Sequence, residues 1–195
     1  MADVNERSDG PSAPADRLAT EADAGRVSPD RARLVACMEL FFFAYRDFTG
    51  DPDAVLEKYG FGRAHHRVLH FVHRNPGLRV ADLLEILKIT KQSLARVLKQ
   101  LIDEGFIAQR EGKSDRRERL LYVTNKGGRL AEKLADLQIG RIREAFASLG
   151  SGADETALRF LFAMIAEKDR AKVRALIEPS AMGGAMWDDD TRGDP

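Results

Sequence analysis

Residues 79–127, RVADLLEILKITKQSLARVLKQLIDEGFIAQREGKSDRRERLLYVTNKG, carry the clearest structural signal in the chain. This stretch contains two apolar stripes with the helical spacing i, i+3, i+4 and i+7, which predict two short helices that each bury one face. Residues 88–90 connect them, Thr90 suits the N-cap of the second helix, and Gly105 suits its end. Two helices joined by so tight a turn predict a helix-turn-helix. The apolar residues are Val80, Leu83, Leu84 and Leu87 in the first helix, and Leu94, Val97, Leu98 and Leu101 in the second.

A β-hairpin is expected directly after the second helix. Residues 106–111 and 119–124 are predicted as strands, and the polar residues 112–118 join them. A charged hairpin tip by itself favours only solubility, but a basic ribbon beside a helix-turn-helix is typical of a wing that reaches the DNA minor groove. Five cationic side chains lie in or beside this connection: Arg110, Lys113, Arg116, Arg117 and Arg119.

The second helix presents hydrogen-bonding and cationic groups on the face opposite its leucines. Gln and Ser pair with base edges in the major groove, whereas Arg and Lys bind either bases or phosphates. Taken alone, the pattern favours an ordinary solvated helix face. Together with the wing, it predicts a helix that binds double-stranded DNA. The candidate residues are Lys91, Gln92, Ser93, Arg96 and Lys99.

The rest of the middle of the chain is expected to be helical. The segment 40–45 is apolar all round, so its helix needs cover on more than one side, which suggests a subunit interface. We therefore expect one mainly α domain over residues 29–177. Its central part, residues 63–124, is a winged helix-turn-helix with a two-stranded wing. Dimerisation helices flank this part at residues 29–60 and 126–177. Helices are predicted at residues 29–49, 51–60, 63–74, 126–149 and 153–177.

Charge is distributed unevenly along the chain. The net charge of zero argues against a nucleic-acid partner, but residues 31–177 hold 27 basic and 19 acidic residues. This excess suits an approach to phosphate. The acidic ends, residues 1–28 and 178–195, are poor in large apolar groups and are expected to be disordered, although Met182, Met186 and Trp187 could dock elsewhere.

The sequence also indicates where the protein works. It contains no apolar run of membrane-spanning length and no signal peptide, so we expect a cytoplasmic protein. The single cysteine, Cys37, has no partner for an internal disulfide, as is usual in a reducing compartment.

The stretch quoted above resembles the winged helix of the MarR family of transcriptional regulators. That signature has an acidic residue and Gly after the recognition helix, a D-x-R wing and a strand that ends in T-x-x-G. Glu104 with Gly105, residues 115–117, and residues 124–127 fill these places. The resemblance extends over residues 31–177, and FFFAYRDFTGDPDAVLEKYGFGRAHHRVLHFV, residues 41–72, resembles the PetP-like subgroup.

The resemblance implies roles for the wing and for the flanking helices. It implies that Arg117 enters the minor groove or braces the wing, and that Asp115 holds an arginine of the wing by a salt bridge. It also implies a two-fold homodimer that binds a pseudo-palindromic operator with half-sites about one helical turn apart. Effectors of the family often bind between the dimer helices and the DNA-binding lobe, where Phe42, Tyr45, Arg63 and His66 are the candidate lining residues.

Two sensor hypotheses remain beside a small-molecule effector. Peroxide-sensing relatives place a reactive cysteine on the first helix, as Cys37 is placed here, but the tyrosines that they present to the thiolate are missing, so a buried, inert thiol is favoured. His66, His70 and His73 share one helix face and could hold a metal or haem, although no carboxylate or cysteine is obviously paired with them. We expect no cofactor.

Two other classes of protein are the alternatives to a DNA-binding regulator. An enzyme is not expected, because the sequence has no G-x-S-x-G, no phosphate-binding glycine loop, no HExxH and no Cys paired by motif with a His. A winged helix that binds only proteins would not need Gln92, Arg96 and Arg117 on its outer surface.

Overall fold

The computed structural model describes residues 28–112, 115 and 117–181. The chain divides into two compact units, residues 1–47 and 48–195, and the division falls within the first helix. The elements are α2 (Pro29–Glu57), α3 (Arg63–Arg74), β1 (Leu78–Arg79), α4 (Val80–Leu87), α5 (Lys91–Asp103), β2 (Ile107–Glu111), β3 (Arg119–Val123), α6 (Asn125–Leu149), α7 (Ala153–Ala163) and α8 (Glu167–Ala181).

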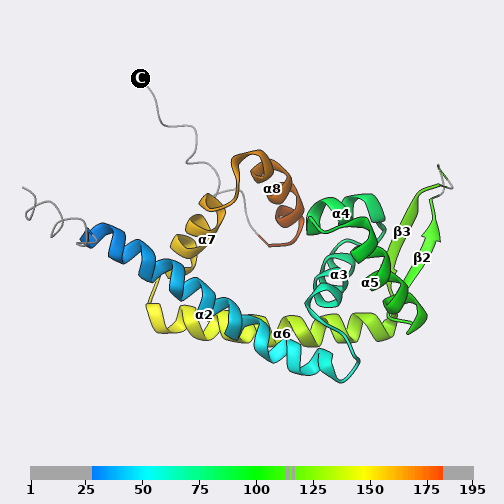
Figure 1. Ribbon diagram of the computed structural model, residues 1–195, viewed down its shortest axis with the longest axis horizontal. Coiled ribbons are helices and arrows are strands. Elements are labelled where there is room, and N and C mark those ends of the chain that lie inside the picture. The colour runs from blue at the N-terminus through cyan, green and yellow to red at the C-terminus, as the bar shows by residue number, and fades with distance from the viewer. Residues whose placement is uncertain (1–27, 113–114, 116, 182–195) are drawn as a thin grey trace, which may run out of the picture. The chain divides into compact units, whose positions relative to one another are not determined.

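The second unit contains the predicted winged helix-turn-helix. Helices α3, α4 and α5 gather beside the hairpin of β2 and β3 (Figure 1). The two apolar stripes of the sequence form the core, in which Leu83, Leu94 and Leu101 are at most 2% exposed. The mainly α fold class, the helix-turn-helix and the hairpin are therefore confirmed.

The sheet has one strand more than the sequence predicts. Its order is β1-β3-β2, with both pairs antiparallel. Strand β1 has two residues, and Leu78 and Arg79 pair with Leu121 and Leu120 of β3. So short a strand carries no alternating pattern, which is why the sequence did not predict it, whereas the two-stranded wing of β2 and β3 is confirmed.

The prediction of two separate helices at 29–49 and 51–60 is wrong, because α2 runs unbroken through Pro52. Proline has no N–H to donate to the carbonyl four residues earlier, which is that of Phe48. That carbonyl accepts a hydrogen bond from the Gln138 Nε2 of α6 at 3.3 Å. A side chain distant in sequence thus satisfies the carbonyl that the proline leaves without its usual partner.

The prediction of one helix over residues 153–177 is also wrong. Helix α7 ends at Ala163, and α8 begins at Glu167. The Arg170 guanidinium donates to the carbonyl oxygens of Ala163 at 2.8 Å and Ile165 at 3.0 Å. These bonds satisfy backbone groups that the end of α7 leaves unpaired, so the break needs neither Gly nor Pro.

Some of the predictions concern residues outside the described ranges, and one concerns a membrane span. The terminal segments 1–27 and 182–195, with Met182, Met186 and Trp187, lie outside the described residues, as do Lys113 and Arg116 of the wing. In the described part of the chain, no helix is both long enough and apolar enough to cross a membrane.

Candidate nucleic-acid interface

Helix α5 separates its buried and exposed faces as the sequence predicts. The Thr90 side chain accepts a hydrogen bond from the Ser93 N–H at 3.1 Å and so caps the helix. Leu94, Val97 and Leu98 are at most 7% exposed. The opposite face is therefore left to solvent. All five candidates on this face are exposed: Lys91, Gln92, Ser93, Arg96 and Lys99.

The turn before α5 contains a left-handed residue that is not glycine. Lys88 has φ 49°, and its N–H donates to the Leu84 carbonyl at 3.0 Å. The Arg67 guanidinium of α3 donates to the Leu87 carbonyl at 3.2 Å, so it holds the end of α4 against α3. Without a glycine, no sequence signal identified this conformation.

The described part of the wing, strands β2 and β3 with the turn between them, is closed by backbone hydrogen bonds. The Gly112 N–H donates to the Glu118 carbonyl at 3.1 Å, and the Glu118 N–H donates to the Asp115 carbonyl at 3.0 Å. The Asp115 carboxylate accepts the backbone N–H of Arg117 at 2.8 Å. Asp115 therefore shapes the turn directly, and the salt bridge to an arginine that the resemblance implies stays a prediction.

Two arginines of the wing strands have defined partners. The Arg110 guanidinium lies 4.8 Å from the centre of the Tyr122 ring, a cation–π contact. Arg119 pairs with Glu111 across the hairpin at 3.0 Å. The exposed Arg117 lies in the turn between these strands. The wing thus presents cationic groups from both strands.

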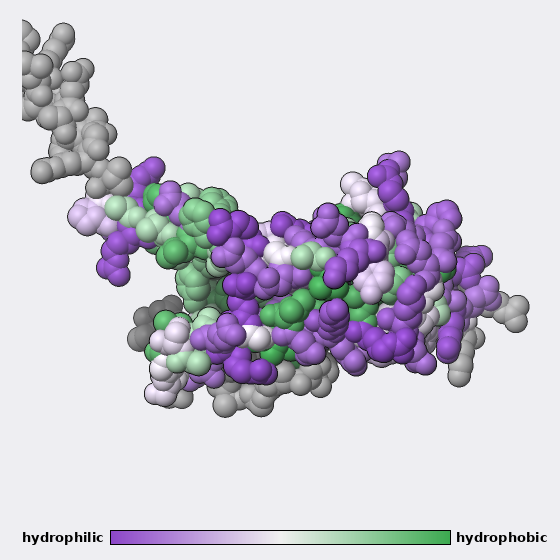
Figure 2. Space-filling view, turned by 90° about the horizontal axis from the view of Figure 1, so that it is seen from below, coloured by the Kyte–Doolittle hydropathy of each residue, from purple (hydrophilic) through white to green (hydrophobic). Residues whose placement is uncertain are grey.

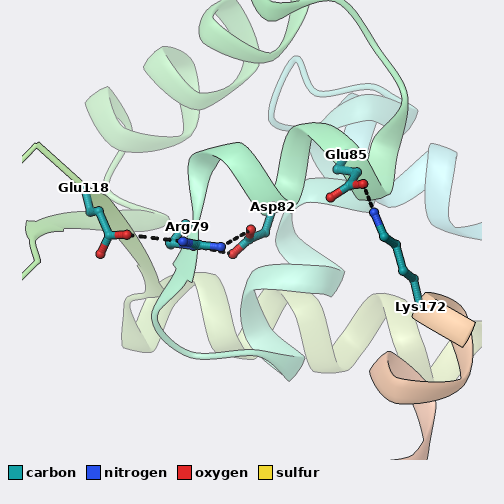
Figure 3. Close-up of polar contacts among 5 residues, drawn as sticks. All are labelled: Arg79, Asp82, Glu85, Glu118 and Lys172. Atoms are coloured by element: carbon teal, nitrogen blue, oxygen red, sulfur yellow. Dashed lines mark hydrogen bonds and ion pairs between the residues drawn. The ribbon is translucent and has the colours of Figure 1, made fainter.

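Arg79 connects the helix-turn-helix to the wing, a role that sequence reasoning missed. Its guanidinium makes two bonds of 2.7 Å to the Asp82 carboxylate in α4 and one of 3.2 Å to Glu118 beside β3 (Figure 3). Hydrogen bonding raises the pKa of Arg79 and lowers that of Asp82. The i, i+3 spacing of Arg79 and Asp82 is visible in the sequence, but the contact with Glu118 requires the register of β1 on β3.

The T-x-x-G motif at 124–127 fixes the end of α5 to the start of α6. The Thr124 side chain accepts the Gly127 N–H at 3.1 Å and donates to the Gly105 carbonyl at 2.7 Å. A Cβ on Gly127 would lie 2.0 Å from the Phe106 carbonyl oxygen, so only glycine fits. Lys126 donates to the Glu104 carbonyl at 2.9 Å. The motif therefore positions α5 through its C-terminal end.

Among the histidines of α3, His65 makes structural hydrogen bonds. His65 Nδ1 accepts the Gly62 N–H at 3.1 Å, so its Nε2 donates to Gln100 of α5 at 2.9 Å. Burial lowers the pKa of His66 and of His70. Across residues 28–112, 115 and 117–181, no group of three or more His, Cys, Asp or Glu side chains is placed to hold a metal, the face of His66, His70 and His73 included.

The remaining candidates divide between the two units. Cys37, Phe42 and Tyr45 belong to α2 in the first unit, where the Cys37 side chain is half-buried and the two aromatic residues are exposed. In the second unit, Arg63 pairs with Asp53 at 2.8 Å, and His66 is 8% exposed. The inert thiol and the effector pocket stay predictions.

Comparison with known proteins identifies the family. A model described as the MarR family matches residues 59–118. The HTH-type transcriptional regulator PetP of Rhodobacter capsulatus is 49% identical over 116 residues, which cover 60% of this chain and 70% of that protein.

Solved structures agree on the fold. The crystal structure of MarR superposes with a TM-score of 0.55 at 20% identity and covers 73% of this chain and 93% of that one. The transcriptional regulator SlyA gives a TM-score of 0.58 at 19% identity, with 73% and 99% covered. These proteins are regulators rather than enzymes, as the sequence predicts. The chain belongs to the MarR family of transcriptional regulators.

Proposed function

We propose that this regulator is a homodimer that binds a pseudo-palindromic operator, with α5 in the major groove and the wing in the adjacent minor groove of each half-site. The observation that carries the proposal is the division of α5, whose leucines are buried while its polar and cationic side chains face solvent beside the wing. An α-helix fits the major groove, and an arginine suits a narrow minor groove.

We infer different tasks for the candidate residues from their positions. Gln92 and Ser93 lie in the first turn of α5, the part of a recognition helix that contacts base edges. Arg117 and Arg110 lie on the wing and suit the minor groove and the phosphates. Asp115 orients the turn before Arg117. Lys113 and Arg116 are included from their place in the sequence.

Apolar side chains support the dimer. Leu40 and Phe42 of α2 are 66% and 65% exposed, and in the second unit Leu149 and Phe160 are 68% and 46% exposed. Figure 2 shows hydrophobic side chains, in green, on the surface of the segment that adjoins the grey N-terminal residues. Contact with a second copy would remove such surface from water. Two-fold symmetry would then place two recognition helices on half-sites about one turn apart.

DNA binding is tested by selecting duplexes from genomic fragments and titrating a selected duplex against a shuffled one. Gln92→Ala should weaken binding to the selected duplex more than to the shuffled one, because a base contact contributes only to the specific complex. Arg117→Ala should weaken both, by roughly 1–3 kcal/mol. Arg143→Ala, which removes the same charge from the C-terminal half of α6, is the matched control and should change neither. If Gln92→Ala and Arg117→Ala both bind the duplexes as tightly as the parent does, the proposal is contradicted.

Dimerisation is tested by sedimentation of the full chain at micromolar concentration. The parent should sediment as a dimer and Phe42→Glu as a monomer, because a charge in a buried interface is costly. Arg33→Glu, on the same helix, serves as the control for a new carboxylate. A monomeric parent contradicts the dimer.

A signal completes the proposed function. It is either a small molecule near Phe42, Tyr45, Arg63 and His66 or an oxidant that reacts with Cys37. Because the inert thiol is favoured, Cys37→Ser should leave DNA affinity unchanged with and without peroxide. A peroxide response that the substitution abolishes would assign the signal to the thiol.

A further inference from the structure

Glu118 closes the turn of the wing with both of its backbone groups. Its carbonyl accepts the Gly112 N–H at 3.1 Å, and its N–H donates to the Asp115 carbonyl at 3.0 Å. The side chain lies against the same turn, since a Cβ on Gly112 would meet the Glu118 Cβ at 3.1 Å and its Oε2 at 3.2 Å. The position of Glu118 therefore constrains the described part of the wing turn.

Arg79 holds the Glu118 side chain from outside the wing. Its Nη1 donates to Glu118 Oε1 at 3.2 Å, while Nε and Nη2 donate to the two oxygens of the Asp82 carboxylate at 2.7 Å (Figure 3). The backbone of Arg79 is fixed as well, because it pairs with Leu120 of β3. A planar guanidinium that bonds two carboxylates has a defined orientation, so Glu118 is held in place relative to α4.

Helix α4 provides a fixed base for this contact. Its Leu83 and Leu87 side chains are at most 3% exposed. Its Glu85 forms an ion pair with Lys172 of α8 (Figure 3). A shift of α4 would have to disturb these contacts, and tightly packed side chains resist such a shift. Arg79 therefore fixes the wing relative to the core of the helix-turn-helix.

The same turn orients Arg117. The Asp115 carboxylate accepts the Arg117 N–H at 2.8 Å, and the Asp115 carbonyl accepts the Glu118 N–H. Hydrogen bonds thus link Arg79 to the backbone of Arg117 through two intermediate residues. A change at Arg79 is therefore expected to reach Arg117.

A direct contact with phosphate is the alternative role for an exposed arginine near DNA. The Arg79 side chain is 51% exposed, but it already bonds Asp82 and Glu118. A phosphate would have to compete with these carboxylates for the guanidinium. One cation between two carboxylates also leaves the cluster with a net negative charge, which repels phosphate. The arrangement therefore favours an indirect role.

We propose that Arg79 is a positioning residue that fixes Glu118 and thereby the placement of Arg117 at the DNA. The contact of Arg117 with DNA rests on the proposed function, whereas the hold of Arg79 on the wing does not depend on it. Arg79 then contributes to duplex affinity through Arg117 and does not itself contact the duplex.

Glu118→Ala distinguishes the two roles by the sign of its effect on duplex affinity. If Arg79 contacted phosphate, removing this carboxylate would free the guanidinium and reduce repulsion, so a selected duplex would bind more tightly. If Arg79 positions the wing, Glu118→Ala should weaken binding about threefold, as Arg79→Ala should. Glu144→Ala, which removes a carboxylate from the C-terminal half of α6, should change nothing. Binding by Glu118→Ala as tight as that of the parent, or tighter, overturns the positioning role.

A double-mutant cycle measures whether Arg79 acts through Arg117. Arg117→Ala should cost less duplex affinity in the Arg79→Ala background than in the parent, because the wing no longer places the guanidinium. Gln92→Ala should cost the same in both backgrounds, since α5 holds this side chain. Circular dichroism and the urea midpoint establish that the variants fold. Equal costs of Arg117→Ala in both backgrounds, or a reduced cost of Gln92→Ala as well, overturn a role specific to the wing.

Hydrogen exchange tests the hold on the wing without DNA. The Gly112 and Glu118 amides donate the hydrogen bonds of the turn, so NMR on the full chain should show them exchanging about threefold faster in Arg79→Ala than in the parent. Arg143→Ala removes the same charge from α6 and should leave both rates unchanged. Unchanged exchange in Arg79→Ala overturns the positioning role. If the chain binds no duplex, the proposed function fails, whereas the exchange rates still decide whether Arg79 holds the wing.

Discussion

The carbonyl of Phe48 accepts a hydrogen bond from Gln138 Nε2 at 3.3 Å, four residues before Pro52. A proline inside a helix deprives this carbonyl of its usual donor, and a buried carbonyl without a partner is costly. Gln138 comes from the middle of α6 and supplies the missing donor. Helix α2 therefore continues through a residue that the sequence predicts as the start of a new helix.

Gln138→Ala should reduce the free energy of unfolding by about 1 kcal/mol, because it leaves the partly buried Phe48 carbonyl without a donor. Urea denaturation measures the change. Gln138→Glu is the matched control for size, and it should lose the bond as well, since a carboxylate accepts but does not donate.

Pro52→Ala tests whether Gln138 replaces the N–H that the proline lacks. It restores an N–H that can bond to the Phe48 carbonyl, so Gln138→Ala should cost less in the Pro52→Ala background than in the parent. Pro52 is buried, so the single substitution carries its own packing cost and the double-mutant cycle removes it. Strictly additive effects would show that Gln138 does not replace the missing donor.

The sequence predicts an element where its own residues carry the signal. The stripes of α4 and α5 repeat at the helical period, and Thr90 and Gly105 mark the ends of α5, so these helices were predicted closely. The break between α7 and α8 has no such mark, because Arg170 supplies the hydrogen bonds that a local breaker would make unnecessary.

The same distinction applies to the candidate interface. Exposure of Gln92 and Arg96 follows from the position of the leucines on one helix. The contact of Arg79 with Glu118 joins residues 39 positions apart and depends on the pairing of β1 with β3. No local pattern specifies such a contact, so the connection of the wing to α4 required the folded chain.

Gly127→Ala should destabilise the protein by roughly 1–3 kcal/mol, because the added Cβ would lie 2.0 Å from the Phe106 carbonyl oxygen and the backbone would have to shift. Gly128→Ala is the matched control. Its Cβ would meet its nearest neighbour, an atom of the His73 ring, at 3.8 Å, an ordinary contact. Alanine also suits a helix better than glycine, so Gly128→Ala should be neutral or slightly stabilising. Equal urea midpoints for the two variants would contradict the role given to Gly127.

Stability should fall as pH drops from 7.5 to 5.5. Burial lowers the pKa of His66 and His70 below the ordinary value of 6.5, so the unfolded chain binds protons more tightly than the folded chain does. Their contribution is complete above about pH 6.5 and is lost progressively below it. His66→Gln and His70→Gln should each flatten the dependence of the urea midpoint on pH.

Carboxylates provide the control for this pH window. The pKa of Asp82 is lowered from 3.8 by Arg79, so its contribution is lost only at more acidic pH, as the pH falls through the pKa of the folded state. Asp82→Asn should therefore leave the slope between pH 5.5 and 7.5 unchanged. If the urea midpoint of the parent protein did not change between pH 5.5 and 7.5, the assignment of the pH dependence to the histidines would be contradicted.

The final prediction concerns Asp115, whose carboxylate accepts the Arg117 N–H at 2.8 Å. Removing a negative charge near DNA should by itself tighten binding, because less repulsion opposes the phosphates. Asp115→Ala also removes the acceptor that shapes the wing turn, and we expect this loss to dominate and to weaken binding by about 1 kcal/mol.

Asp115→Asn separates the two effects because it removes the charge but keeps an oxygen that can accept the same N–H. It should bind a selected duplex at least as tightly as the parent does, whereas Asp115→Ala should bind more weakly than both. Titrations at several salt concentrations check the comparison, since the electrostatic part varies with salt and the geometric part does not. If Asp115→Ala bound more tightly than the parent, charge repulsion would outweigh orientation, and the wing would not depend on this hydrogen bond.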